Sequence, residues 1–429
     1  MLRHRATGIV IVSGALLLLI GSVVHRALNI RRTGDTEDFR YFYNAALAML
    51  RGHDIYAATD GRYLYPPFLA FVFQPLALLP EFLAAMLWAV VTALMVGAAL
   101  VIASKEACGR WNGDDSARAL PVLAVAAIAL VLFGEKIHAN FTLGQTDAIM
   151  LLGFACVLRW MQRRPLLAGI AVGLTANVKY LSLICVPYFL WKRNYRAALS
   201  SVLAFGFFML LPAVEIGVAQ SARFISGAFR GLTGMMSTGT TAEGDAGIYG
   251  VEWGRSISIT SALFRFTRSR GMADLWAVLL IGAVCLAILG AVVLIARRCG
   301  VRIFGRADSQ SETASAVLAL EWSVLIFLAV AFSPQSTARH LTLIMLAYIV
   351  ALAVLRRAPP TARSYALVAG MTITLLGLST PWRELGFRHF ARLWRDVGGA
   401  TWCALLMILA LVWCGCCALR QTSRKRADV

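Results

Sequence analysis

The sequence predicts an all-α, polytopic membrane protein, a transmembrane helical bundle of about 11–13 helices. Its 429 residues are 59% hydrophobic and only 15% charged, with a mean hydropathy of +0.72. A soluble domain usually carries about 25% charged residues, so a single water-soluble core is excluded. The apolar residues form long runs, and basic residues gather in small clusters at the ends of those runs. We therefore expect one integral membrane domain over residues 1–429 with inserted loops.

Apolar windows that predict helices recur along the whole chain. Several are shorter than the roughly 20 residues that a perpendicular membrane helix needs. The windows fall near residues 7–29, 82–103, 119–134, 146–160, 165–179, 180–191, 197–217, 274–296, 316–332, 340–355, 364–378 and 400–418.

Three segments need a separate interpretation. The first window follows a basic start and lacks a small-residue cleavage site, so we predict a retained helix and not a signal peptide. Residues 165–191 are predicted to form two short helices that meet at a kink, or a re-entrant hairpin. Residues 66–79 contain three prolines, which damage a regular span, and are predicted to be re-entrant or interfacial.

The basic clusters predict the sidedness of the chain. If the N-terminus is cytoplasmic and every window crosses, six basic segments fall on the inner side. They lie near residues 105–118, 159–164, 192–196, 297–306, 356–363 and 420–426. Both termini are then cytoplasmic, with residues 420–429 as a basic tail of a multi-pass cell-membrane protein. The net charge of +19 is explained by contact with membrane lipids, and no nucleic-acid partner is predicted.

The larger connections then lie on the outer face, periplasmic or extracellular. They are residues 30–81, which we expect to be the catalytic loop, and residues 218–272. The outer segments 218–272 and 380–397 also carry several Arg, but long loops count less in this rule. A Gly-, Thr- and Ser-rich tract at residues 231–250 is interpreted either as a lid over a site or as simple disorder.

Three carboxylates, Asp35, Glu37 and Asp38, precede a helical pattern in the first outer loop. Apolar residues at positions 39, 42, 43, 46, 47 and 50 have the spacing of an amphipathic helix. We expect this helix to lie flat on the outer membrane surface and to end near Arg51 and Gly52. Asp38 stands at its N-terminus, where the helix dipole favours an ionised carboxylate that suits a general base. A plain N-cap is the alternative interpretation.

Polar residues also interrupt two later apolar runs near the predicted outer side. Gln145 and Asp147 open one window, and Lys179 lies between two others. A lysine there is costly unless it reaches water, a carboxylate or an anionic ligand. We predict that Lys179 binds a phosphate, and an ion pair with Asp147 or Glu135 is the alternative.

Further along, Arg339 and His340 follow Pro334 at an outer helix junction. Such a pair can bind a phosphate, and a turn with interfacial cations is the alternative. Tyr65 taken alone is typical of an aromatic belt at a membrane interface. The nine cysteines have no metal-ligand spacing, and the chain lacks a P-loop, an HExxH motif and a nucleophile elbow. We predict no metal and no cofactor.

Several short motifs, taken in order, resemble one family. They are Asp38-Phe39-x-x-Phe42-Tyr43, Gly52-x-x-x-Tyr56, Tyr65-Pro66-Pro67, Gly144-Gln145-x-Asp147, Lys179, and Ser333-Pro334-x-Ser336 continuing to His340. This order resembles glycosyltransferase family 87, the polyprenyl-phosphate-mannose-dependent mannosyltransferases of the GT-C type. The sequence departs from the family at Asp147, where Asn is more usual, and at Arg339, where the first of two His often stands. The last 80 residues carry no specific resemblance.

The resemblance implies a GT-C fold whose first outer loop carries the catalytic Asp. On this sequence that residue is Asp38, with Asp35 as the fallback. The implied partners are a polyprenyl-phosphate sugar donor, expected to carry mannose, and a lipid or glycan acceptor. Lys179, Arg339 and His340 are the expected contacts of the donor phosphate. The wider substrate-binding set is Tyr65, Gln145 and Asp147. The expected reaction is one inverting displacement.

Two other classes of function also fit a bundle of about a dozen helices. A transporter or flippase for a lipid-linked sugar or another solute fits the polar interruptions, but such proteins often show internal repeats and the sequence has none. A noncatalytic membrane scaffold is disfavoured by the polar residues gathered on one predicted face.

Overall fold

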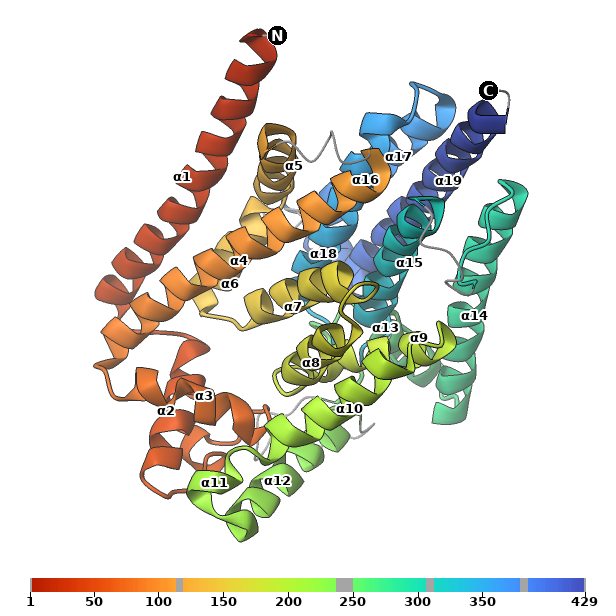
Figure 1. The fold of residues 1–429 in the computed structure, drawn as a ribbon. Coiled ribbons are helices and arrows are strands. Elements are labelled where there is room, and N and C mark those ends of the chain that lie inside the picture. Colours follow the sequence, from red (N-terminus) through yellow and green to blue (C-terminus); the bar gives the residue numbers. More distant parts are fainter. Residues whose placement is uncertain (1, 113–118, 237–249, 306–311, 379–384, 428–429) are drawn as a thin grey trace.

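The computed structural model describes residues 2–112, 119–236, 250–305, 312–378 and 385–427. Over these ranges every regular element is an α-helix or a 3-10 helix (Figure 1). The predicted all-α bundle is therefore confirmed. The tract 237–249, most of the predicted lid, lies outside the described residues.

Each of the predicted apolar windows falls on a helix. The matching helices, in chain order, are α1 (Leu2–Thr33), α4 (Glu81–Asn112), α5 (Ala119–Leu132), α7 (Asp147–Trp160), α8 (Pro165–Ala176), α9 (Cys185–Trp191), α10 (Tyr195–Leu210), α14 (Asp274–Arg298), α15 (Glu312–Ala331), α16 (Met345–Arg357), α17 (Ala362–Leu378) and α19 (Gly399–Ala427).

These helices differ in whether they can cross a bilayer alone. Among the described residues, seven helical segments are long and apolar enough to span. An eighth span is possible from α5 and α6 (Gly134–Leu143), which are bent by 69°. The predicted pair at 165–191 forms α8, the 3-10 helix η3 (Tyr180–Ile184) and α9, all too short to span singly. The count of helices thus exceeds the count of full spans.

The first connection folds into a compact unit. α2 (Phe39–Leu50) begins and ends as predicted, but its apolar face does not lie open for lipid. Phe39 and Phe42 are buried, and the Phe42 ring meets that of Phe73 at 5.8 Å. Phe73 belongs to α3 (Pro67–Ala77), which the proline-rich segment forms because Pro67 occupies the first helical turn, where a missing N–H costs nothing. α3 therefore covers the surface that we expected to face the membrane.

The second connection is also more helical than predicted. Residues 218–272 contain α12 (Val218–Met236) and α13 (Ile259–Ser269), and α11 (Ala213–Ile216) precedes them. The last helix, α18 (Arg388–Asp396), lies before α19. Tyr56, next to the short 3-10 helix η1 (Ala57–Thr59), donates to the Phe224 carbonyl oxygen of α12 at 2.9 Å. The two predicted outer connections are therefore joined.

Close helix packing in the bundle depends on small residues. An added Cβ at Gly173 of α8 would lie 2.5 Å from the backbone nitrogen of Phe205, and one at Gly169 would lie 2.5 Å from the carbonyl oxygen of Ala197. Both contacts are with α10. Small residues permit this approach of two backbones, as is common between membrane helices.

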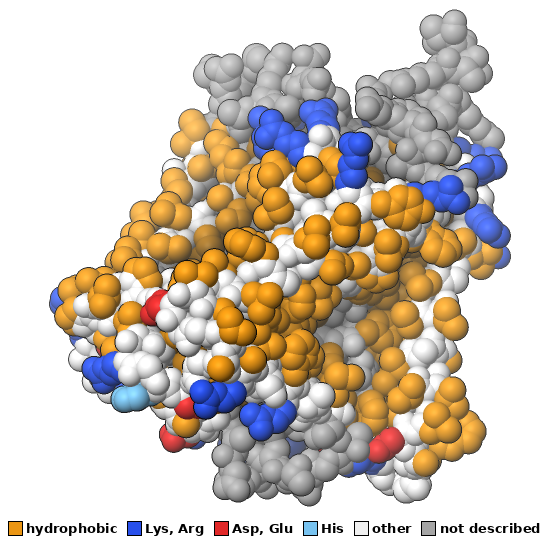
Figure 2. Space-filling model, turned by 60° about the horizontal axis from the view of Figure 1, so that its bottom comes forward, with side chains coloured by type: hydrophobic (Ala, Val, Ile, Leu, Met, Phe, Trp, Pro, Cys, Tyr) orange, Lys and Arg blue, Asp and Glu red, His pale blue; other side chains and the backbone are white. Residues whose placement is uncertain are grey.

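The arrangement of ends and surfaces is that of a membrane protein. The start of α1 and the end of α19 lie at the same end of the molecule, whereas α2, α3, α11 and α12 lie at the opposite end (Figure 1). A broad hydrophobic surface separates Lys and Arg side chains at its upper and lower margins (Figure 2). Leu286 of α14, for example, is 70% exposed. An exposed apolar surface of this extent is typical of contact with lipid.

Candidate functional site

Asp38 occupies the N-cap position of α2, yet its side chain makes no capping hydrogen bond. Both polar contacts of the carboxylate instead cross to distant parts of the chain. Arg339 Nη1 lies 2.9 Å from Asp38 Oδ2, and Gln145 Nε2 donates to the same oxygen. The alternative of a plain N-cap is therefore wrong. The carboxylate remains about one-third exposed, with Oδ1 outside both of these contacts.

A second cluster adjoins the first. Lys179 Nζ contacts Asp147 Oδ1 and lies 3.1 Å from His340 Nε2. Asp147 is almost fully buried and 4.0 Å from His340 Nε2. The ion pair with Asp147, proposed as the alternative for Lys179, is thus present, whereas Glu135 pairs with Lys136.

The two clusters are continuous because their residues are sequence neighbours. Gln145 lies in the turn between α6 and α7, and Asp147 begins α7. His340 begins the 3-10 helix η4 (His340–Ile344), and Arg339 precedes it as the N-cap residue. Lys179 lies in the break between α8 and η3. Every member therefore stands at a helix end or a helix break, where side chains can leave the apolar packing of the spans.

The hydrogen bonds of His340 place proton donors at this junction. The backbone N–H of Thr337 donates to His340 Nδ1 at 3.0 Å. The other ring nitrogen, Nε2, faces Lys179 and Asp147. Lys179 and the Arg339 guanidinium present converging donors beside His340, which is the chemistry that binds phosphate oxygens.

Two residues that the sequence analysis missed hold the α6–α7 turn. Arg26 of α1 is buried and donates to the carbonyl oxygens of Phe141, at 2.6 Å, and Thr142. It also reaches the Thr36 carbonyl oxygen at 3.3 Å, two residues before Asp38. Trp88 Nε1 donates to the Gly144 carbonyl oxygen at 3.0 Å. A buried arginine in an otherwise apolar membrane helix was the available signal for this role.

Backbone conformation completes the turn. Gly144 has φ +66°, a left-handed conformation that glycine adopts without strain. An added Cβ there would lie 2.6 Å from Arg26 Nη2 and 2.7 Å from the Phe39 Cβ. The glycine therefore lets α1, α2 and the α6–α7 turn meet beside Asp38.

Two residues predicted for the site lie outside these clusters. Asp35 pairs with Arg40 at 3.2 Å and accepts from the Glu37 backbone N–H. Tyr65 packs edge-on against Phe42, with ring centroids 5.1 Å apart. Among the described residues, no group of three or more His, Cys, Asp or Glu side chains has the geometry to hold a metal ion.

A family model and several known proteins match parts of this chain. A family model described as glycosyltransferase family 87 matches residues 63–334, more than half of the chain. This chain belongs to glycosyltransferase family 87. The matched range of family 87 includes Tyr65, Gln145, Asp147 and Lys179.

By their names, curated relatives of this family 87 chain transfer two different sugars, mannose and arabinofuranose. A polyprenol-phosphate-mannose-dependent alpha-(1-2)-phosphatidylinositol pentamannoside mannosyltransferase of Mycolicibacterium smegmatis is 30% identical over 168 residues, which are 38% of this chain and 37% of that protein. An alpha-(1->3)-arabinofuranosyltransferase of Mycobacterium tuberculosis is 29% identical over 192 residues, 42% of each chain. The chain thus spans only about two fifths of the length of these relatives.

Among solved structures, the apo crystal structure of ArnT from Cupriavidus metallidurans is similar to this family 87 chain with a TM-score of 0.39 and 17% sequence identity. The match covers 97% of this chain and 77% of ArnT.

Proposed function

We propose that this protein is a membrane glycosyltransferase that moves a sugar from a polyprenyl-phosphate donor to a lipid or glycan acceptor. Membership of family 87 and the names of the mycobacterial relatives support the reaction class. Mannose is the proposed sugar. Arabinofuranose is the second candidate, because relatives with that activity align with a similar share of the chain.

The observation that carries the proposal is the position of Asp38. Its carboxylate makes no capping hydrogen bond and instead contacts Gln145 and Arg339. The side chains of Lys179 and His340 lie next to this pair. A base for the acceptor and cations for the donor phosphate must be neighbours, since the bond that forms and the bond that breaks share one anomeric carbon. The contact of Asp38 with Arg339 and Gln145, next to Lys179 and His340, supports this proposal.

In the proposed reaction, Asp38 Oδ1 accepts the proton of the acceptor hydroxyl. The acceptor oxygen attacks the anomeric carbon, and the bond from that carbon to the phosphate oxygen breaks with its electron pair passing to the phosphate. The donor diester becomes a monoester with an additional negative charge. Arg339, Lys179 and His340 stabilise that charge where it develops. One displacement inverts the anomeric carbon.

The donor also gives Arg339 a second partner. Arg339 is paired with Asp38 Oδ2. A bound phosphate attracts the guanidinium, since bidentate contact with phosphate is a preferred geometry of arginine. Movement of Arg339 toward the donor would leave Asp38 freer to accept a proton, so donor binding prepares the base. We place this site on the periplasmic or extracellular face, with both termini in the cytoplasm.

Asp38→Asn tests the role of the base. Purified protein is assayed with mannosyl-phosphoryl-polyprenol and, separately, with an arabinofuranosyl-phosphoryl-polyprenol donor, each with extracted membrane acceptors. We expect Asp38→Asn to lower the transfer rate by about 10²-fold or more, because general base catalysis contributes about 10²–10⁴-fold. Asp35→Asn, the matched control, should stay within about threefold of wild type. Equal rates for wild type and Asp38→Asn would exclude Asp38 as the base, and the preferred donor identifies the sugar.

A further inference from the structure

A groove lies on the lipid-facing side of the bundle, between α14, α17 and α19. Its volume is about 450 Å³, and most of its lining is apolar, from Ile295, Ala366, Leu409 and Ala410. Arg298, at the end of α14, and Trp413 of α19 complete the wall. The family 87 motifs and the clusters around Asp38 and Lys179 include none of these residues.

Positive charge gathers at one end of this groove. Arg298 lines it directly, and the Arg363 guanidinium lies 5.9 Å from the centre of the Trp413 ring. Cys299 is another lining residue, and the positive charges of Arg363 and Arg420 act on its thiol. Burial raises the pKa of the Cys299 thiol, and these two guanidiniums oppose that rise. Arginines of three helices thus contribute positive charge at this end of the groove.

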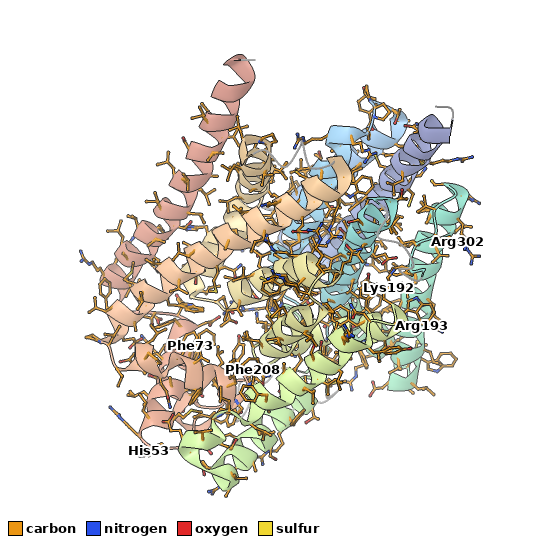
Figure 3. The ribbon with its side chains drawn as sticks, in the orientation of Figure 1. His53, Phe73, Lys192, Arg193, Phe208 and Arg302 are labelled. Atoms are coloured by element: carbon orange, nitrogen blue, oxygen red, sulfur yellow. The ribbon has the colours of Figure 1, made fainter. Side chains whose placement is uncertain are left out.

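The groove is placed where a bilayer lipid would reach it. α14 is the most exposed of the candidate spans, with 11% of its apolar window buried, whereas 67% of the window of α19 is buried. The C-terminal end of α14, marked by nearby Arg302 in Figure 3, lies at the same end as both chain termini. The unit of α2 and α3, which carries Asp38, lies at the opposite end (Figure 1).

We propose that this groove is a binding site for an anionic phospholipid of the leaflet opposite the transfer site. The apolar walls take an acyl chain, and Arg298, Arg363 and Arg420 bind the phosphate of the headgroup. Basic pockets between membrane helices on the cytoplasmic side bind acidic lipid headgroups in this manner. Trp413 stands beside the charged end, as tryptophan does at membrane interfaces. A zwitterionic lipid fits less well because its own ammonium group cancels the phosphate charge.

Native mass spectrometry of the delipidated full-length protein tests the site. The protein is titrated with phosphatidylglycerol or with phosphatidylcholine of the same acyl chains. We expect wild type to bind its first phosphatidylglycerol at least about tenfold more tightly than phosphatidylcholine. The double variant Arg298→Gln/Arg363→Gln should lose that preference. Arg297→Gln is the matched control, since Arg297 is the neighbouring residue on α14 but does not line the groove, and it should keep the preference.

Two further experiments distinguish a lipid site from a site that binds only a free anion. Ala366→Phe fills the groove and leaves every charge in place, so it should weaken phosphatidylglycerol binding as much as the double variant does. Inorganic phosphate should not displace the lipid, because the acyl chain contributes part of the affinity. Equal binding of the two lipids by wild type, or equal loss in Arg297→Gln and the double variant, would overturn the proposal. Displacement by inorganic phosphate would overturn it too, as it would show an anion site without a chain groove. Unfolding midpoints of all variants show whether they fold.

Discussion

At the scale of single residues, the site depends on charged side chains whose partners come from other segments. Asp147 is almost fully buried, and Lys179 is its cationic partner. A buried carboxylate that keeps its charge needs such a partner, because desolvation of an unpaired ion costs several kcal/mol. Lys179 therefore offsets the desolvation cost of Asp147, and the pair holds Lys179 beside His340.

A double-mutant cycle separates these two contributions. Asp147→Asn leaves Lys179 without its buried partner, so we expect the free energy of unfolding to fall by about 3 kcal/mol. In Asp147→Asn/Lys179→Met both charges are absent, so much of that stability should return. Sugar transfer should still be lost in this double variant, because Lys179 is missing. Unfolding midpoints and transfer rates of the two variants and of Lys179→Met give the comparison. Full activity in the double variant would show that Lys179 has no part in transfer.

At the scale of elements, helix ends decide which residues meet. The start of α2, the α6–α7 turn, the break between α8 and η3, and the start of η4 all supply residues of the two clusters. Asn140 of α6 donates to the Thr342 hydroxyl oxygen of η4 at 2.9 Å and ties two of these ends together. The position of α8 in turn depends on its close contact with α10, which sets where Lys179 emerges.

The contact between α8 and α10 predicts opposite effects for two similar substitutions. Gly173→Ala places a methyl group 2.5 Å from the Phe205 backbone nitrogen, so the helices must separate. We expect a loss of about 2 kcal/mol in the free energy of unfolding. Gly206→Ala on α10 faces open space and should be neutral or stabilising by up to about 1 kcal/mol. Thermal unfolding of both variants in the same detergent measures the difference, and similar midpoints would contradict the packing argument.

At the scale of the whole molecule, the chain termini and the unit that carries Asp38 lie at opposite ends. Both chain termini lie at one end of the molecule, and the unit of α2 and α3 lies at the other (Figure 1). Between them the surface is widely hydrophobic (Figure 2). A polyprenyl-phosphate donor fits this division, since its chain stays in the bilayer and its phosphate at one interface.

Introduced cysteines test the sidedness. His53, beyond the end of α2, and Arg302, beyond the end of α14, lie at opposite ends of the molecule (Figure 3). In intact cells, a membrane-impermeant maleimide should label His53→Cys, and Arg302→Cys should react only after permeabilisation. The unmodified protein gives the background of the native cysteines. Labelling of Arg302→Cys alone in intact cells would reverse the proposed orientation.

Much of the bundle is predictable because apolar runs and helices are local features. A run of apolar residues forms a helix in a membrane whatever its neighbours, since every backbone hydrogen bond is made within the segment. Each apolar window is therefore helical, although only seven or eight of the described segments are long enough to span. The start of α2 is confirmed by its amphipathic spacing. Sequence order also carried the family resemblance, which the match over residues 63–334 confirms.

The tertiary structure alone decided which polar groups meet and which surfaces are covered. Asp38 and Arg339 are 301 positions apart, and no local pattern distinguishes a capping aspartate from one that reaches across the fold. The supporting roles of Arg26 and Trp88 and the cover of α2 by α3 are likewise contacts between distant segments. Local sequence therefore determined the helices and their polar breaks, whereas packing determined the partners, because hydrogen bonds and ion pairs need side chains that only the fold brings within reach.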